Sequence, residues 1–503
     1  MRPVFATRVA AALLSLALAL LPAPAWAVRW PFAKVFARKA ARAPVAPVHV
    51  WVTSADQSLL LSHEPDLGLR AADGTSGADG GAAAGALLID PATRYQAYLG
   101  VGAAMTDASA VAINKSLNPK QRKALVRELF GDATDHPSGL GLGFIRVPIG
   151  GSDFSQLHYS LDDVERGRSD PALARFRLDP YRTGQVPLLL EARKVNPGLL
   201  LMASPWSAPA WMKDNDSLVG GHLQPRWYGA FADYLVRFSD EFTKAGLPLY
   251  ALSLQNEPGY DAPDYPGMVV TPGERARLVA DALGPRLAKR PNAPLLLDHD
   301  HNWDEPQSPA RVLGDPAAAR YIGGVAWHCY KGHVPAQSKL HDQFPAFDAY
   351  MTECSGGGWQ KDWEEALRWF YGEVVIGSFD NWARAVALWN LVLDTTHGPH
   401  AGGCKNCRGV VTIDAHGHVT RNVEYYALAH VTRCLRTGAR RVASSGGPDG
   451  VATVAFRNAD DGSLVLLAYN GARQARPLAV RAGARGFDYE LAAGSAATFC
   501  WRP

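Results

Sequence analysis

The chain contains 503 residues, of which 47% are hydrophobic and 20% are charged, and its formal net charge is +3 at pH 7. This balance is typical of a globular protein with a large core and room for two domains. It excludes the strong basic or acidic excess of proteins that bind nucleic acid or membrane surfaces, so we expect no nucleic-acid partner.

The N-terminus has the pattern of a signal peptide. Arg2 and Arg8 precede an apolar run at 9–21, and the small-x-small sequence at 25–27 follows it. Because that run is shorter than the roughly 20 residues that span a membrane, residues 1–27 are predicted to be cleaved after export. The product is expected to be secreted or periplasmic, without stable membrane insertion, and an uncleaved anchor is the alternative. Residues 28–47 mix Pro, Ala and basic residues without periodicity and are predicted to form a linker.

Ordered β structure is predicted to begin with VHVWV at 48–52, and residues 48–90 are assigned to N-terminal strands. From 91 to 435, eight short apolar runs alternate with amphipathic segments such as 226–245, whose apolar residues recur at three- and four-residue steps. The runs lie at 95–101, 143–148, 199–204, 249–254, 295–298, 324–328, 349–353 and 385–389. Eight strands alternating with helices predict an α/β fold, the parallel (β/α)8 TIM barrel, whose active site lies at the C-terminal rim of the strands.

The tail at 436–503 has a different pattern. Its segments VATVAFRN, SLVLLAYN and PLAVRA alternate apolar with polar residues and are separated by Gly- and Asp-rich turns. We therefore predict an appended antiparallel β-sandwich domain, built from this tail together with the strands at 48–90, which precede the first barrel strand.

Two glutamates stand where predicted barrel strands end, Glu257 in LSLQNEPGY and Glu353 in AYMTECSGG. Further polar and aromatic residues lie within or just after the apolar runs. These are Asp107, Arg146, Trp206, Trp211, Asn256, His328, Tyr330, Trp389 and Asn390. Because the carboxyl ends of barrel strands meet at one rim, these residues predict a pocket there.

Paired carboxylates in such a pocket match the needs of glycoside cleavage. The transition state resembles an oxocarbenium ion, so one carboxylate acts from the open face of the sugar while a protonated acid serves the departing oxygen. Two carboxylates held close together resist both being charged, which raises the pKa of one and keeps it protonated. The structural alternative for Glu257 is a buried ion pair with Arg146. No metal or organic cofactor is expected, since acid, nucleophile and water suffice.

Six cysteines would meet an oxidising compartment after export. Cys404 and Cys407, which are separated by two residues in a glycine-rich segment, are predicted to form a local disulfide. Free thiols and a zinc site are the alternatives, although no second C-x-x-C or H-x-x-H follows at finger spacing. Cys354, directly after Glu353, is predicted to be a packed small side chain rather than a nucleophile.

The rim segments, taken together, resemble glycoside hydrolase family 30, and within it the glucosylceramidase (acid β-glucosidase) branch. The matching strings are GVGAAMTDASA, FIRVPIGGSDFS, ASPWSAPAWMK, LQNEPG, VAWHCY, MTECS and LWNLVLD, in family order from about residue 96 to 394. The resemblance implies retention of anomeric configuration, with Glu257 as general acid/base and Glu353 as nucleophile. It also implies that Asp107, Trp206, Asn256 and Trp389 line the glucose subsite, and that His328 and Tyr330 support the glutamates.

Two departures limit what the resemblance implies about the group attached to the sugar. The chain has His328-Cys329-Tyr330 where the human-type enzyme has His-Trp-Tyr, and the segment HGPHAGGCKNCRGVV differs from the human-type loop. The leading expectation is a retaining β-glucosidase of the glucosylceramidase type, which acts on a glycolipid in sphingolipid metabolism. The alternatives are an endo-β-1,6-glucanase, a family 30 enzyme for xylose or fucose, and a non-catalytic carbohydrate-binding barrel.

Overall fold

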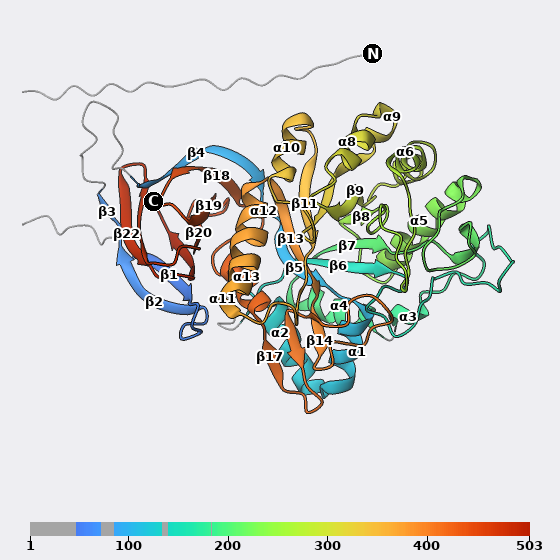
Figure 1. Ribbon diagram of the computed structural model, residues 1–503, viewed down its shortest axis with the longest axis horizontal. Coiled ribbons are helices and arrows are strands. Elements are labelled where there is room, and N and C mark those ends of the chain that lie inside the picture. Colours follow the sequence, from blue (N-terminus) through green and yellow to red (C-terminus); the bar gives the residue numbers. More distant parts are fainter. Residues whose placement is uncertain (1–46, 72–84, 133–138, 183) are drawn as a thin grey trace, which may run out of the picture. The chain divides into compact units, whose positions relative to one another are not determined.

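The computed structural model describes residues 47–71, 85–132, 139–182 and 184–503 (Figure 1). The predicted signal peptide and residues 28–46 of the predicted linker lie outside the described residues, and Pro47 is the first residue of strand β1 (Pro47–Thr53). Within the described ranges, none of the helices combines the length and the apolar character that crossing a membrane requires.

Eight parallel strands close into a barrel in the cyclic order β5, β6, β7, β8, β9, β10, β11 and β13 (Figure 1). The strands are β5 (Gly100–Ala104), β6 (Phe144–Ile149), β7 (Leu200–Pro205), β8 (Ala251–Ser253), β9 (Leu295–Asn302), β10 (Ile322–His328), β11 (Asp348–Glu353) and β13 (Ala383–Asn390). Each strand overlaps one of the eight apolar runs. The predicted TIM barrel is therefore confirmed, because strands that are buried on both faces read as short continuous apolar runs.

Two strand boundaries differ from the predicted ones. The run at 95–101 is divided between β4 (Leu87–Ala97), which pairs with sandwich strand β18, and β5, which pairs with β13. The fifth strand, β9, continues beyond Asp298 to Asn302 and carries polar residues to the rim. His299 and Asp300 have positive φ angles of 77° and 48°, and the pairing of β9 with β10 is irregular here. From the sequence alone, a polar and kinked strand end of this kind is predicted to be a loop.

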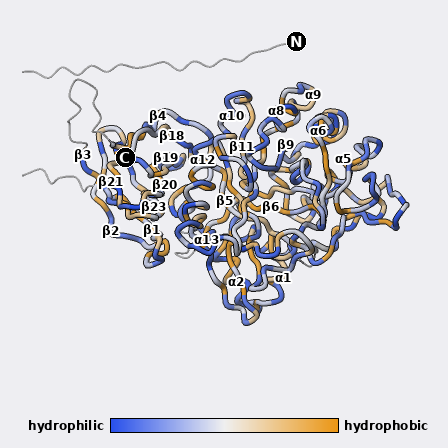
Figure 2. The backbone as a smooth tube through the Cα atoms, in the orientation of Figure 1, coloured by the Kyte–Doolittle hydropathy of each residue, from blue (hydrophilic) through white to orange (hydrophobic). Residues whose placement is uncertain are grey.

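Helices surround the barrel strands, and α5 shows why they form. Its residues Phe231, Tyr234, Leu235, Phe238 and Phe242 are buried along one face. Hydrophobic and hydrophilic stretches accordingly alternate along the backbone tube of the surrounding helices (Figure 2). The helices are α1 (Asp107–Ser116), α2 (Pro119–Phe130), α3 (Asp179–Arg182), α4 (Gln185–Val195), α5 (Tyr228–Lys244), α6 (Pro272–Arg277), α7 (Gly284–Leu287), α8 (Gln307–Leu313), α9 (Pro316–Ala319), α10 (Ala336–Gln343), α11 (Trp363–Leu367), α12 (Gly377–Asp380) and α13 (Val423–Thr432).

The appended β domain contains ten strands in the order β2, β1, β23, β20, β19, β18, β4, β21, β22 and β3. Besides β1 and β4 these are β2 (Ser62–Gly68), β3 (Arg70–Ala71), β18 (Arg440–Gly446), β19 (Val451–Arg457), β20 (Leu464–Asn470), β21 (Arg476–Ala482), β22 (Arg485–Leu491) and β23 (Ala496–Trp501). All neighbours are antiparallel except β4 and β21. Because β1 pairs with β23, the predicted sandwich of N-terminal and C-terminal segments is confirmed.

Short strands at the barrel rim complete the structure. β12 (Gly356–Gly357) pairs with β15 (Cys407–Arg408), and β14 (Val392–Asp394), β16 (Val411–Ile413) and β17 (Val419–Arg421) form a three-stranded sheet. The barrel and the sandwich meet at His430 of α13, a fully buried residue whose ring nitrogens lie 3.0 Å from Thr498 Oγ1 of β23 and 2.9 Å from Thr53 Oγ1 of β1. A disulfide between Cys434 and Cys500 joins the same two parts.

Candidate active site

Glu257 and Glu353 face one cavity of about 660 Å³ at the C-terminal ends of the barrel strands. Glu353 is the last residue of β11, whereas Glu257 follows β8 in a short turn and has a positive φ angle of 45°. A non-glycine residue in this conformation costs on the order of 1–3 kcal/mol, and such strain is common at functional sites. The turn thereby directs the Glu257 carboxylate into the cavity that Glu353 also lines.

Arg146 connects the polar groups beneath this cavity. Its guanidinium, fully buried in β6, donates to Glu353 Oε2 at 2.5 Å, to Asp300 Oδ2 at 2.7 Å and to Asn256 Oδ1 at 2.7 Å. The ion pair considered as the structural alternative for Glu257 is thus made by Glu353 and Asp300. A buried guanidinium with two carboxylate partners fixes their positions, and removing it would leave buried charges uncompensated.

His328 links Glu257 to this network. At the end of β10, its Nε2 lies 3.0 Å from Asp300 Oδ1 and its Nδ1 lies 3.3 Å from Glu257 Oε1. Asp300 also accepts hydrogen bonds from the hydroxyls of Ser204 and Thr352. Because Asp300 is an ionised acceptor paired with Arg146, Nε2 carries a proton, and the contact between Nδ1 and Oε1 holds one further proton shared by His328 and Glu257.

The pKa directions agree with a proton that is shared. Burial lowers the pKa of His328, but the negative charges of Glu353, Asp300 and Glu257 outweigh it and raise the value to about 9. Burial raises the pKa of Glu257, yet the hydrogen bonds with His301 and His328 lower it to about 2. Across neutral pH the pair therefore keeps one proton, which resides on His328 while the cavity is empty.

Glu353 is held from two sides. Its Oε2 accepts from Arg146, and its Oε1 accepts a hydrogen bond of 2.8 Å from the Tyr330 hydroxyl. Burial raises the pKa of Glu353, the charge of Glu257 adds to this effect, and His328 and Arg146 counteract it. The carboxylate is therefore positioned by the two groups that favour its charged form.

A disulfide between Cys329 and Cys354 joins the residues next to Tyr330 and Glu353. Cys354 is fully buried, as predicted, and its sulfur is paired with that of Cys329. The disulfide connects the end of β10 to the end of β11, so the two strand ends that hold the Glu353 hydrogen bond are tied covalently.

Two tryptophans lie stacked beside the glutamates. Trp206 follows β7 and Trp389 belongs to β13, and their ring centroids are 5.0 Å apart with an interplanar angle of 22°. The Arg146 guanidinium lies over both rings, at 4.8 and 5.6 Å from their centroids. Trp389 lines the cavity. Trp206 and Asn256 adjoin the residues of the cavity, because Trp206 stacks on Trp389 and Asn256 accepts a hydrogen bond from Arg146. Their place in the glucose subsite stays a prediction.

Asp107 lies apart from the glutamates. It is the first residue of α1 and lines a separate cavity of about 480 Å³. Its carboxylate accepts hydrogen bonds from Gln185 and from Tyr159, the latter at 3.2 Å, and burial raises its pKa. The resemblance implies that Asp107 lines the glucose subsite, and this role stays a prediction; its carboxylate faces the cavity of about 480 Å³.

The predicted local disulfide between Cys404 and Cys407 is present and lines the catalytic cavity. It closes the loop that precedes β15, and β15 pairs with β12 directly after Glu353. Trp359 follows β12, is 57% exposed and borders the same cavity. A Cβ at Gly357 would overlap the Trp359 indole, so this glycine allows the ring to pack closely against the backbone.

Several residues of the cavity were missed by the sequence reasoning. Asp153 lies in the loop after β6, and His301 and Asn302 end β9. Burial and the charges of Glu353 and Glu257 raise the pKa of Asp153 well above its ordinary value. The polar run HDHN at 299–302, directly after the fifth apolar segment, is the sequence signal for the β9 residues, because every rim residue predicted from the sequence lies on or just after another strand.

Glu257, His301 and His328 could also approach a metal ion, since one ligand atom of each lies within 4.8 Å of the others. The Asp300 contact on the far side of His328 and the shared proton explain this grouping without a metal.

Comparisons with known proteins identify both parts of the chain. Residues 98–435 match the glycosyl hydrolase family 30 TIM-barrel domain, and residues 438–499 match the glycosyl hydrolase family 30 beta sandwich domain. The endo-1,6-β-D-glucanase of Neurospora crassa is 33% identical over 402 residues, which covers 76% of this chain and 81% of that protein.

Two further proteins extend the comparison. The lysosomal acid glucosylceramidase of Mus musculus is 30% identical over 445 residues, or 83% of each chain. A solved structure of an endo-β1,6-glucanase superposes with a TM-score of 0.80 at 28% identity and covers 91% of this chain and all of that one.

Proposed function

The chain belongs to glycosyl hydrolase family 30 and is a glycoside hydrolase, and we propose that it cleaves internal bonds of a β-1,6-glucan with retention of anomeric configuration. The proposed substrate rests on one observation, the similarity to endo-1,6-β-glucanases in both sequence and structure. The glucosylceramidase activity expected from the sequence is the second candidate, supported by the similarity to the mouse enzyme.

In the first step, Glu353 attacks the anomeric carbon of the sugar and forms a glycosyl ester. Arg146 and Tyr330 hold its two carboxylate oxygens, so the nucleophile needs no reorientation before the attack. The developing positive charge on the sugar ring is stabilised by the remaining negative charge of this network.

The departing glycosidic oxygen needs a proton, and Glu257 is placed to deliver it. When substrate enters, the proton on His328 Nδ1 passes to Glu257 Oε1, which is 3.3 Å away in the empty site. This transfer turns a charged pair into a neutral carboxylic acid and a neutral imidazole, which suits a cavity from which a sugar has displaced water. Glu257 then protonates the leaving group.

In the second step, Glu257 accepts a proton from water, and the water attacks the anomeric carbon of the ester. This releases the sugar in its original configuration and restores the Glu353 carboxylate. Asp153 and Asn302, which line the cavity, are placed to hydrogen-bond sugar hydroxyls, and Trp389 offers its ring to the sugar face.

Exposed aromatic side chains at the cavity mouth support a polysaccharide substrate. Trp359 and Tyr260 are 57% and 44% exposed, and both border the cavity from segments that follow the two catalytic glutamates. Flat, exposed rings can stack on the apolar face of a sugar residue beyond the cleaved bond. We assign Trp359 to this platform, because its indole packs closely against the Gly357 backbone and is still 57% exposed at the cavity.

Replacing Trp359 with Ala tests this assignment. We expect kcat/KM for a linear β-1,6-glucan to fall at least about tenfold, or about 1.4 kcal/mol, while hydrolysis of an aryl β-glucoside changes little. Leu157→Ala is the matched control, since Leu157 is an exposed apolar residue that borders the Asp107 cavity instead. An equal decrease in kcat/KM for both substrates would show that Trp359 does not bind the polysaccharide beyond the cleaved bond.

A panel of substrates distinguishes the two candidates. Linear β-1,6-glucan, glucosylceramide, aryl β-glucosides, aryl β-xylosides and aryl β-fucosides are incubated with the enzyme, and the products are identified by chromatography. We expect oligosaccharides from the glucan at early times. Release of glucose from glucosylceramide with no action on the glucan would establish the second candidate instead. The β anomer should be the first product detected by proton NMR, and an α anomer would contradict retention.

We also propose that the chain is exported. All six cysteines are paired in disulfides, as expected in an oxidising compartment. N-terminal sequencing of the exported protein should begin at Val28, and retention of residues 1–27 would favour the uncleaved anchor.

A further inference from the structure

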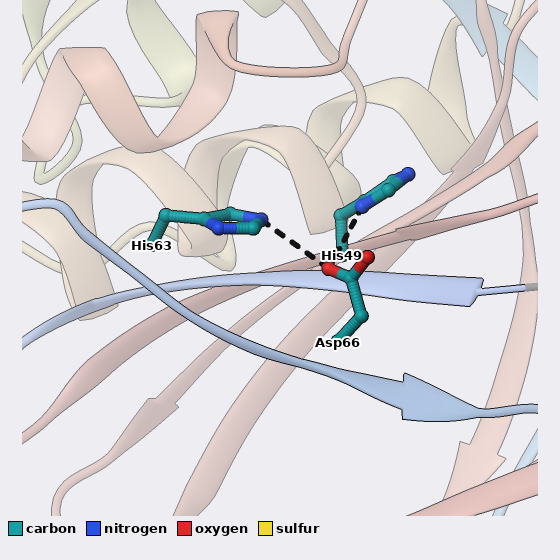
Figure 3. A group of neighbouring side chains, drawn as sticks. All are labelled: His49, His63 and Asp66. Atoms are coloured by element: carbon teal, nitrogen blue, oxygen red, sulfur yellow. Dashed lines mark hydrogen bonds and ion pairs between the residues drawn. The ribbon is translucent and has the colours of Figure 1, made fainter.

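We propose that the outer face of the hairpin formed by β1 and β2 is a binding site for a divalent transition-metal ion such as Zn²⁺, with His49, His63 and Asp66 as ligands. Figure 3 shows the three side chains converging from the two strands. None of them lines the catalytic cavity, and the catalytic proposal makes no use of them.

An irregularity in strand pairing brings the three side chains together. His49 and Trp51 lie on one face of β1 because they are two residues apart, and Trp51 is paired with His63 of β2. Asp66 is three residues from His63, and in a regular strand it would point to the opposite face. The register shifts between Val48 and Val50, and this bulge turns Asp66 toward the two histidines.

The distances between the ligand atoms suit one shared ion. Asp66 Oδ1 lies 2.9 Å from His49 Nδ1 and 3.3 Å from His63 Nε2. Zinc bonds of about 2.0–2.2 Å at tetrahedral angles place neighbouring ligand atoms roughly 3.3 Å apart. All three ligand atoms lie within 4.8 Å of one another, so a small rotation of either imidazole completes the set.

The donor set determines the class of ion. Two imidazole nitrogens and one carboxylate oxygen favour Zn²⁺, Cu²⁺, Ni²⁺ or Co²⁺, whereas Mg²⁺ and Ca²⁺ prefer oxygen alone. The side chains are 44%, 50% and 38% exposed for His49, His63 and Asp66, so an ion can enter from solvent and water can complete its coordination.

Binding here would fasten the edge of the sandwich. β2 is the terminal strand of the ten-stranded order and is mostly exposed, so few packed side chains hold it against β1. The Trp51 ring lies 4.9 Å from the His63 ring and supports it from the neighbouring strand. One ion with ligands from both strands would add a cross-link at this edge and stabilise the folded state.

Titration of the chelator-treated protein with Zn²⁺, followed by calorimetry, tests the proposal. We expect one ion per chain, at least tenfold weaker binding in His49→Ala and in His63→Ala, and no signal with Mg²⁺ or Ca²⁺. His333→Ala, which removes an exposed histidine elsewhere, is the matched control and should bind as the unmodified chain does. Zn²⁺ should raise the Tm of the unmodified chain but not that of His63→Ala.

Two further measurements complete the test. Electron paramagnetic resonance with Cu²⁺ should show coupling to two imidazole nitrogens, and one of these should be lost in His63→Ala. Circular dichroism of each variant without metal should match the unmodified chain. Absence of Zn²⁺ binding, or equal binding in all the variants, would overturn the site. Binding that survives in His63→Ala and inhibits hydrolysis would locate the ion at Glu257, His301 and His328 instead, and would also overturn it.

Discussion

Replacing His328 with Asn tests whether the catalytic proton is shared between His328 and Glu257. In the unmodified chain this proton leaves as the pH rises through about 9. In the variant the alkaline limb of the activity profile belongs to Glu257 alone, and the pKa of a catalytic glutamate is typically tuned no higher than about 6–7. The limb should therefore move to lower pH by about two units, which corresponds to about 2.7 kcal/mol of lost proton affinity.

The assay is the pH dependence of kcat/KM on an aryl β-glucoside whose leaving group needs protonation. At pH 8, the variant should retain roughly a tenth of its plateau activity. His301→Asn is the matched control. His301 Nδ1 lies 3.4 Å from Glu257 Oε1, so both histidines are close to this carboxylate. Of the two described histidines, His328 is the one that also contacts Asp300. An alkaline limb that stays near pH 9 in His328→Asn would refute the shared proton.

Three further predictions concern the nucleophile, the buried network and the domain junction. Glu353→Gln should lower kcat by at least about a thousandfold, or about 4 kcal/mol, with an unchanged Tm, as measured by steady-state kinetics and calorimetry. Arg146→Met should lower the free energy of unfolding by about 3–5 kcal/mol in urea titrations, because Glu353 and Asp300 lose their buried cation. Burial, with a smaller contribution from Arg433, lowers the pKa of His430 to about 3. As the pH falls, the unfolded chain therefore binds a proton at this histidine before the folded chain does. The free energy of unfolding should fall by up to about 1.4 kcal/mol per pH unit between about pH 6.5 and pH 3. His430→Gln should lack this pH dependence, and an equal pH dependence in both chains would contradict a buried neutral His430.

The barrel could be predicted from the sequence because its strands are buried on both faces. Runs such as 324–328 and 349–353 are mostly apolar and end in an ionisable residue, His328 or Glu353. Local composition therefore carries both the strand and the position of its functional end. The sandwich could also be predicted from the sequence, because its strands alternate apolar with polar residues between Gly-rich turns.

The missed residues of β9 carry a local signal of a different kind, the polar run HDHN at 299–302, which by itself indicates a loop rather than a strand. β9 continues through polar residues only because Asp300 finds Arg146, Ser204 and Thr352 on other strands. That compensation arises from tertiary contacts and is absent from the sequence of the segment itself. Asp107 follows an apolar strand as a functional residue would, and as the first residue of α1 it accepts hydrogen bonds from Gln185 and Tyr159. Its place in the glucose subsite stays a prediction.

The charges of the buried network explain why its parts belong together. Arg146 contributes one positive charge, Asp300 and Glu353 contribute one negative charge each, and the pair of His328 and Glu257 is neutral overall while it holds its proton. The sum is one negative charge, placed at Glu353 where the oxocarbenium-like transition state develops positive charge. Loss of the shared proton would add a second negative charge beside the nucleophile and remove the acid. The same event therefore ends the first step of the reaction, in which Glu257 must donate a proton, and the alkaline limb of the activity profile should report on His328.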